Sequence, residues 1–307
     1  MPKVTVAIPT YNREEYLKES LKSILDQSFQ DFSVIVFDNH SDYDIRRLIA
    51  DFNDHRISLI QSDVNIGNAA NFHKIFNYKY DSEYLIIFHD DDAMHPELLE
   101  AEVSIMDKDK NIMLVGAEMN FISDDKQMFV FKPFKKEKSA IVFSNCSGLI
   151  RMILKDFNLC FDSAMYRTAA LIDIADCQKR FSKWADRPIM VEIAKKGNSA
   201  LIREKLVNYR IHSNQDSQSG FSSESKCLLN LYKYYRDNLP QPLRGADQRL
   251  FNRFSTNQIV LSGLGFSRNF KEYINFIEAS KKEGLFSFRY LNIRGLYYFL
   301  RVLRRFL

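Results

Sequence analysis

Three consecutive aspartates, Asp90, Asp91 and Asp92, are the group in this chain best suited to chemistry. They follow the apolar run Tyr84–Phe88 and precede Pro96, so we expect them on a loop between a buried strand and a helix. Adjacent carboxylates repel one another, and a nearby cation would stabilise them. Divalent ions such as Mg²⁺ and Mn²⁺ prefer oxygen ligands. The triplet is therefore either a metal site or a solvated acidic turn.

Apolar runs and helical patterns alternate along the chain up to this triplet. Strands are expected at Lys3–Ile8, Ser33–Phe37, Ile57–Gln61 and Tyr84–Phe88, with helices at Glu14–Gln27, Ile45–Phe52 and after the turn Asn65–Asn68. The alternation predicts an α/β fold in which helices cover both faces of a mostly parallel sheet. Ligands bind at the carboxyl ends of the strands in such sheets.

Polar clusters fall at these predicted strand ends. Thr10–Arg13 follows the first strand, Asp38-Asn39 the second, Asn65–Asn68 the third, and the aspartates the fourth. Their convergence on one sheet edge predicts a ligand site there. The loop after the first strand lacks the glycines of a dinucleotide fingerprint or a P-loop, so neither of these sites is supported.

The second half of the chain is expected to add strands and then become helical. We expect strands at 112–116, 162–166 and 201–208, and helices at 97–106, 149–154, 227–235 and 249–261, with a further helix ending at Gly197. The segment 213–225 is rich in Ser, Gln and Asn and predicts a loop or linker. We therefore predict a catalytic domain over residues 1–220 and a helical C-terminal region over 221–307.

Composition limits the class of protein. The four cysteines lack CxxC spacing, which predicts reduced thiols in a cytoplasmic protein and no zinc site. The N-terminus has no signal-peptide pattern, and no apolar window is long enough to span a bilayer. We expect a cytoplasmic protein that is peripheral at the inner face of a bacterial membrane.

The membrane expectation comes from the basic end of the chain. Residues 286–307 hold five arginines and no acid, so removing them takes the net charge of +4 to −1. The basic excess thus belongs to this segment, and no nucleic-acid-binding face is expected. Its aromatic and aliphatic residues suit a helix lying on an anionic membrane surface, although packing on its own domain or a dimer contact would also explain them.

With these parts placed, the sequence resembles the family 2 glycosyltransferases of the GT-A (Rossmann-like) fold. The resemblance is carried, in order, by VTVAIPTYNREEYLKESLKSILDQSF, VIVFDN, NIGNAANF, FHDDDAMHPELL, WADRPIMVEIAKKG and YRIHSNQDS, and it covers about the first 220 residues. One departure is His89, which stands where many members have the first aspartate of the metal-binding DxD motif. It leaves open which carboxylates share the ion.

The resemblance implies a donor site for a nucleotide-diphosphate sugar. The residues implied to hold the nucleotide, ribose or phosphates are Thr10, Tyr11, Arg13, Asp38, Asn68, Asn71, Asp90 and Arg210. Asp91 is implied as the main ligand of Mn²⁺ or Mg²⁺, joined by Asp92 and by His212, which could instead be a surface histidine. The cation would stabilise the diphosphate as a leaving group.

The resemblance also implies Asp186 as the catalytic base. A carboxylate can take the proton from an acceptor hydroxyl that attacks the anomeric carbon, which inverts the configuration. Ala185 replaces the acid that usually precedes it in the family, and Asp186 could equally cap the helix that begins at Arg187-Pro188.

The expected function is metal-dependent, inverting transfer of a hexosyl or N-acetylhexosaminyl group from a UDP-sugar to a glycan or lipid-linked glycan. Two alternatives stay open: a non-catalytic binding or scaffold module of the same fold, and a sugar nucleotidyltransferase.

Overall fold

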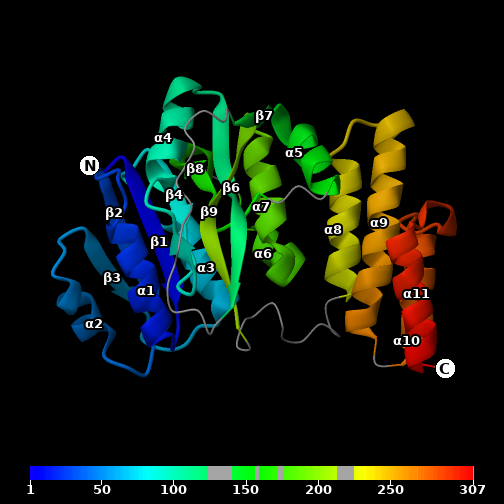
Figure 1. Cartoon of the computed structure of the whole chain (residues 1–307), viewed down its shortest axis with the longest axis horizontal. Coiled ribbons are helices and arrows are strands. Elements are labelled where there is room, and N and C mark those ends of the chain that lie inside the picture. Colours follow the sequence, from blue (N-terminus) through cyan, green and yellow to red (C-terminus); the bar gives the residue numbers. More distant parts are fainter. Residues whose placement is uncertain are drawn as a thin grey trace. The chain divides into compact units, whose positions relative to one another are not determined.

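The computed structural model describes residues 1–123, 140–155, 159–171, 174, 176–212, 225–267 and 269–306. Most of the segment expected as a linker, 213–224, lies outside these residues. The strands are β1 (Val4–Thr10), β2 (Phe32–Asp38), β3 (Ile57–Gln61), β4 (Tyr84–Ile87), β5 (Ala93–Met94), β6 (Ile112–Ser123), β7 (Ile141–Phe143), β8 (Met165–Arg167) and β9 (Asn198–Ile211) (Figure 1).

Helices alternate with these strands and then continue alone. They are α1 (Glu14–Leu25), α2 (Ile45–Phe52), α3 (Asn68–Asn77), α4 (Leu98–Lys108), α5 (Asn145–Leu154), α6 (Asp176–Phe181), α7 (Asp186–Ala194), α8 (Ser225–Asp237), α9 (Gly245–Phe266), α10 (Phe270–Lys282) and α11 (Ile293–Phe306). Short 3₁₀ turns lie at Thr168–Leu171, Ser182–Trp184 and Phe288–Tyr290.

The chain forms two compact units. The first comprises Met1–Asn145, Asn158–Asp176 and Ile189–Ser213, and the second comprises Cys146–Phe157, Cys177–Pro188 and Asn214–Leu307. Two inner segments of the sequence thus belong with the C-terminal helices. The functional division at residue 220 stays a prediction.

A mixed sheet organises the first unit. Its strand order is β3-β2-β1-β4-β8-β6-β9-β5, with β7 paired to β9. The first four of these strands are parallel, as the alternation predicts, whereas β8 runs antiparallel to both of its neighbours. The parallel half therefore brings four strand ends to one edge.

The core of this unit follows from the two-residue period of the strands. Val4, Val6 and Ile8 of β1 are fully buried and share one hydrophobic cluster with residues of α1, α2 and α4. Their neighbours in β1 face the other side of the sheet, where α3 contacts β1 and buries Ile75 and Phe76. The mostly parallel α/β sheet flanked by helices is confirmed.

One predicted strand is displaced in a way that matters for the site. The strand expected at 162–166 begins only at Met165. The amides of Ser163 and Ala164 donate to the carbonyls of Cys160 and Phe161, so consecutive turns use the backbone groups that a strand would need. Asp162 consequently lies on a loop that leads into β8.

Helices alone build the larger part of the second unit. In α9, Gly263 lets the ring of Tyr273 from α10 approach closely, because a Cβ there would lie 2.7 Å from that ring. Among the described residues, no helix combines the length and the apolar character that crossing a bilayer requires.

Candidate functional site

Thr10, at the end of β1, begins a polar network at the carboxyl edge of the sheet. Its hydroxyl donates to Oδ2 of Asp90 over 2.7 Å. Nη1 of Arg13 lies 2.9 Å from Oδ1 of Asp90 and 2.7 Å from Oδ2 of Asp91. Both carboxylates are nearly inaccessible to solvent, and Arg13 is partly exposed. The loops after β1 and β4 are therefore joined by one guanidinium.

The end of β9 completes this network from a distant part of the sequence. Nε2 of His212 lies 2.9 Å from Oδ2 of Asp91. The amide of Arg210 donates to Oδ1 of Asp92 over 2.8 Å, and Nε of Arg210 donates to the carbonyl of Asp91 over 2.9 Å. The buried guanidinium of Arg210 also pairs with Glu19 of α1. All three predicted metal ligands thus lie in one network with four of the predicted donor-binding residues, Thr10, Arg13, Asp90 and Arg210.

Asp38 lies beside this network because of strand register. Thr10, Asp38 and Gln61 are aligned across β1, β2 and β3. The buried carboxylate of Asp38 accepts bonds from the hydroxyl of Ser41 at 2.6 Å and from Nε2 of Gln61 at 3.0 Å. These bonds fix its orientation at the strand end.

The remaining predicted donor residues differ in exposure. Tyr11 and Asn68 are exposed. Asn71 is buried in α3, and its Nδ2 donates to the carbonyl of Phe37 over 3.0 Å. Its Oδ1 has no hydrogen-bond partner among the described residues. The bond to Phe37 fixes the orientation of the Asn71 amide.

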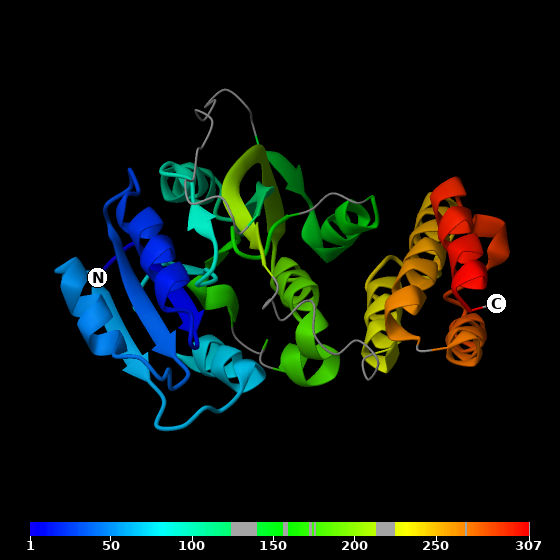
Figure 2. The same ribbon diagram turned by 60° about the horizontal axis from the view of Figure 1, so that its bottom comes forward.

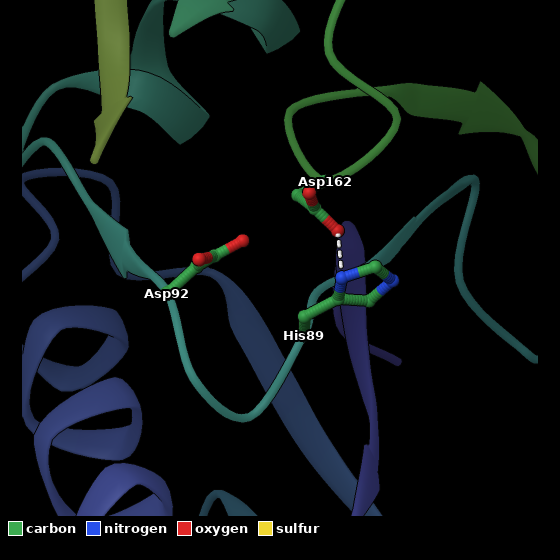
Figure 3. Close-up of side chains that lie close together, drawn as sticks. All are labelled: His89, Asp92 and Asp162. Carbon is green, nitrogen blue, oxygen red and sulfur yellow. Dashed lines mark ion pairs between the residues drawn. The ribbon is translucent and has the colours of Figure 1, made fainter. Parts of the chain in front are cut away.

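A second cluster shares Asp92 with this network and also contains His89 and Asp162 (Figure 3). Nδ1 of His89 lies 2.7 Å from Oδ1 of Asp162, and the Asp92 carboxylate points toward both side chains. One ligand atom from each of these three residues lies within 4.8 Å of the others. Oδ2 of Asp92 is buried and has no hydrogen-bond partner among the described residues. Carboxylate oxygens with an imidazole nitrogen are a donor set that a transition-metal ion such as Mn²⁺ accepts, so the residues present fit a divalent cation.

Burial and crowding shift the titration of this loop. Burial raises the pKa of Asp90 to about 6. The charge of Arg13 lowers this pKa, and the charge of Asp91 raises it. Burial, together with the charges of Asp162 and Asp91, raises the pKa of Asp92 well above its ordinary value. Burial alone would raise the pKa of Asp91 too, but the charges of His89 and Arg13 outweigh it and lower that pKa. The pKa values of Asp90 and Asp92 are raised because negative charges are crowded together away from water. A bound cation would offset this repulsion.

Asp186 is the first residue of α7 and belongs to the second unit. An acidic side chain in the first turn of a helix is favoured by the helix dipole. Its charge contributes to the raised pKa of Tyr235, which reaches about 12 mainly through burial. The role of Asp186 as catalytic base stays a prediction.

The profile of the family described as Glycosyl transferase family 2 matches residues 5–174, more than half of the chain. The chain belongs to glycosyl transferase family 2. The family membership suggested by the sequence motifs is thereby confirmed, and the chain is a glycosyltransferase that depends on a nucleotide-sugar donor.

Other members of the family are similar over much of the chain. An uncharacterized glycosyltransferase of Methanocaldococcus jannaschii is 29% identical over 239 residues, which is 76% of this chain and 78% of the relative. WfgD of Escherichia coli, a UDP-Glc:alpha-D-GlcNAc-diphosphoundecaprenol beta-1,3-glucosyltransferase, is 28% identical over 153 residues, covering 49% of this chain and 59% of the relative.

Solved structures confirm the GT-A fold. A structure of residues 1–349 of Staphylococcus aureus TarS in complex with UDP-GlcNAc matches with a TM-score of 0.68 at 16% identity, over 98% of this chain and 89% of that chain. The mannosyltransferase PcManGT of Pyrobaculum calidifontis, in complex with GDP-Man and Mn²⁺, matches with a TM-score of 0.56 at 13% identity, over 99% and 80% of the two chains. These low identities establish the fold only.

Sequence reasoning missed Asp162 and Glu19 and noted His89 only as a departure. Asp162 is the one acid in the apolar stretch 159–166, and this was the available signal, because a buried acid needs a partner. Glu19 carries no signal in the sequence, since it lies on an ordinary amphipathic helix.

Proposed function

We propose that this family 2 member transfers a sugar from a UDP-sugar to a hydroxyl of a lipid-linked glycan, with inversion and with the help of a divalent cation. The observation that carries the proposal is the joining of Asp90 and Asp91 to Arg13 and His212 at the carboxyl edge of the sheet. This is the edge at which α/β sheets bind their ligands.

A UDP-linked donor is supported by Asp38 and by two similar proteins. The Asp38 carboxylate is oriented by Ser41 and Gln61, as a group that hydrogen-bonds to the edge of a base must be. The TarS structure contains UDP-GlcNAc, and the name of WfgD specifies UDP-Glc. In the proposed site, Thr10, Tyr11 and Arg13 line the nucleotide, Asn68 and Asn71 approach the ribose, and Asp90 and Arg210 complete the donor pocket.

Asp91, Asp92 and His212 would hold the cation, which supplies charge that stabilises the departing diphosphate. The PcManGT structure with Mn²⁺ supports such a cation. The neighbouring cluster of His89, Asp92 and Asp162 is a competing ligand set that shares Asp92. Replacing a ligand that belongs to only one of the two sets therefore distinguishes them.

We expect His212→Gln to weaken Mn²⁺-dependent binding of UDP by at least about tenfold, whereas Asp162→Asn leaves it unchanged. Only the first substitution removes a side chain that contacts Asp91. Calorimetric titration of UDP, with and without Mn²⁺, measures the difference without requiring catalysis. His73→Gln, an exposed histidine on α3, is the control. The reverse pattern would move the ion to the cluster of His89, Asp92 and Asp162.

Asp186 is proposed to accept the proton of the acceptor hydroxyl. The hydroxyl oxygen bonds to the anomeric carbon as the bond from that carbon to the diphosphate oxygen breaks, and UDP leaves with the electron pair. The acceptor is proposed to be linked to a lipid diphosphate because the name of WfgD specifies such an acceptor.

The proposal is tested by incubating the purified chain with Mn²⁺, a panel of UDP- and GDP-sugars and a synthetic polyprenyl-diphosphate glycan. We expect the UDP-sugars to give an extended glycan and one UDP per transfer. Release of pyrophosphate in a parallel incubation with UTP and a sugar 1-phosphate would instead indicate a nucleotidyltransferase. Tight binding of UDP without turnover of any donor would favour a non-catalytic binding module.

A further inference from the structure

The last helix, α11, has one face packed on its own unit. A Cβ at Gly295 would collide with Oδ1 of Asn257 in α9, so the two helix backbones approach closely there. The same amide side chain binds the segment that precedes α11: its Nδ2 donates to the carbonyl of Tyr290 over 3.1 Å, and its Oδ1 accepts from the amide of Asn292 over 3.1 Å. Figures 1 and 2 show α11 beside α9 and α10. The helix is therefore fixed in its rotation about its own axis.

Aromatic contacts fix the same inner face further along. The ring of Phe299 lies 6.3 Å from that of Tyr273 and 5.6 Å from that of Phe288, measured between ring centroids. Phe299 follows Gly295 by four residues, so both lie on one side of the helix. The positions opposite to them must face away from α9.

Those opposite positions form an apolar stripe. Ile293, Leu296, Tyr297 and Leu300 are spaced at i, i+3, i+4 and i+7, which places them on one helix face. Their exposed fractions are 89%, 48%, 60% and 49%. Four large apolar side chains in one exposed row are more than the scattered surface residues of an ordinary protein.

Positive charge borders this stripe. Arg294 and Arg301 are exposed along one side of the stripe. The exposed Arg304 lies one helical turn beyond Leu300. Residues 286–307 contain no acid that could neutralise these charges. An apolar row bordered by arginines matches a bilayer surface with anionic headgroups, because the row enters the acyl boundary while the guanidinium groups meet phosphates. A second copy of the chain would bring a second set of arginines against the first.

We infer that α11 docks this glycosyltransferase on an anionic membrane surface through Ile293, Leu296, Tyr297 and Leu300, with Arg294, Arg301 and Arg304 at the headgroups. The inference deepens the proposed function, since a lipid-linked acceptor resides at such a surface. It also goes beyond the charge of the segment, because it assigns one face of α11 to the lipid and the opposite face to α9.

Flotation of the full chain with vesicles tests the inference and needs no catalysis, so its failure is distinguishable from failure of the proposed transfer. We expect strong binding to phosphatidylcholine vesicles that contain phosphatidylglycerol, and weak binding to phosphatidylcholine alone. Arg294→Gln/Arg301→Gln should lower the partition coefficient on anionic vesicles by about thirtyfold. Ile293→Ser/Leu300→Ser should lower it by about tenfold or more.

The matched control is Arg46→Gln/Arg47→Gln on α2, which removes two exposed arginines from another helix. Circular dichroism and thermal unfolding establish that each variant is folded. If the two double arginine variants lose vesicle binding equally, the inference is overturned, since binding would then follow net charge alone. A parent that fails to float, or a dimer in light scattering that Ile293→Ser/Leu300→Ser converts to monomer, would also overturn it.

Discussion

Replacing Asp186 with asparagine is expected to lower the turnover number by about 10³-fold while the affinity for UDP stays within about twofold of the parent. Asparagine keeps the size of the side chain but cannot accept the proton of the acceptor hydroxyl. The donor is proposed to contact other residues, so its binding does not depend on this carboxylate. The measurement is the steady-state rate of sugar transfer, combined with calorimetric titration of UDP and Mn²⁺.

The control for this variant is Glu192→Gln, which makes the same change of charge in the same helix. Glu192 pairs with Lys195 over 2.7 Å, and we expect its replacement to leave the turnover number near that of the parent. Asp186 is not the base if Asp186→Asn transfers sugar at the parental rate. If instead the affinity for UDP and the rate fall together, Asp186 contributes to donor binding.

The parallel half of the fold was predictable because its physical signals are local. Each of its strands is a short apolar run that ends at a polar cluster, and each helix between them has apolar residues at helical spacing. Parallel strands joined by helices place all their carboxyl ends on one edge, so the meeting of Thr10 with Asp90 follows from topology. The same reasoning aligns Asp38 with both neighbouring strands.

The other half depends on pairings that a sequence pattern does not encode. β8 enters the sheet between β4 and β6, although β5, β6 and β7 come between β4 and β8 in the chain. That insertion brings Asp162 to His89. The contact was not predicted, because a strand was expected to begin at residue 162. Similarly, the second unit takes in Cys146–Phe157 and Cys177–Pro188, which no shift in composition marks.

Asp91→Asn is expected to abolish the increase in UDP affinity that Mn²⁺ provides and to lower kcat/KM by about 10²-fold or more. The Asp91 carboxylate is the point at which two cationic side chains meet, because its Oδ2 lies 2.7 Å from Arg13 and 2.9 Å from His212. Its pKa is lowered by His89 and Arg13 despite burial, so it is the carboxylate of the triplet most firmly held in the charged form. An amide in its place offers the cation a neutral ligand and leaves His212 facing no charge at that position.

Two comparisons separate this role from a general effect of charge. Asp63→Asn removes an exposed acid on the loop between β3 and α3 and should leave the titration with UDP and Mn²⁺ unchanged. Asp90→Asn should reduce donor affinity whether or not Mn²⁺ is present, because Asp90 accepts from Thr10 and Arg13 and is assigned to the donor pocket rather than to the ion. If Asp91→Asn retains the full Mn²⁺-dependent gain in affinity and Asp90→Asn loses it, the ion is held one residue earlier in the loop than we propose.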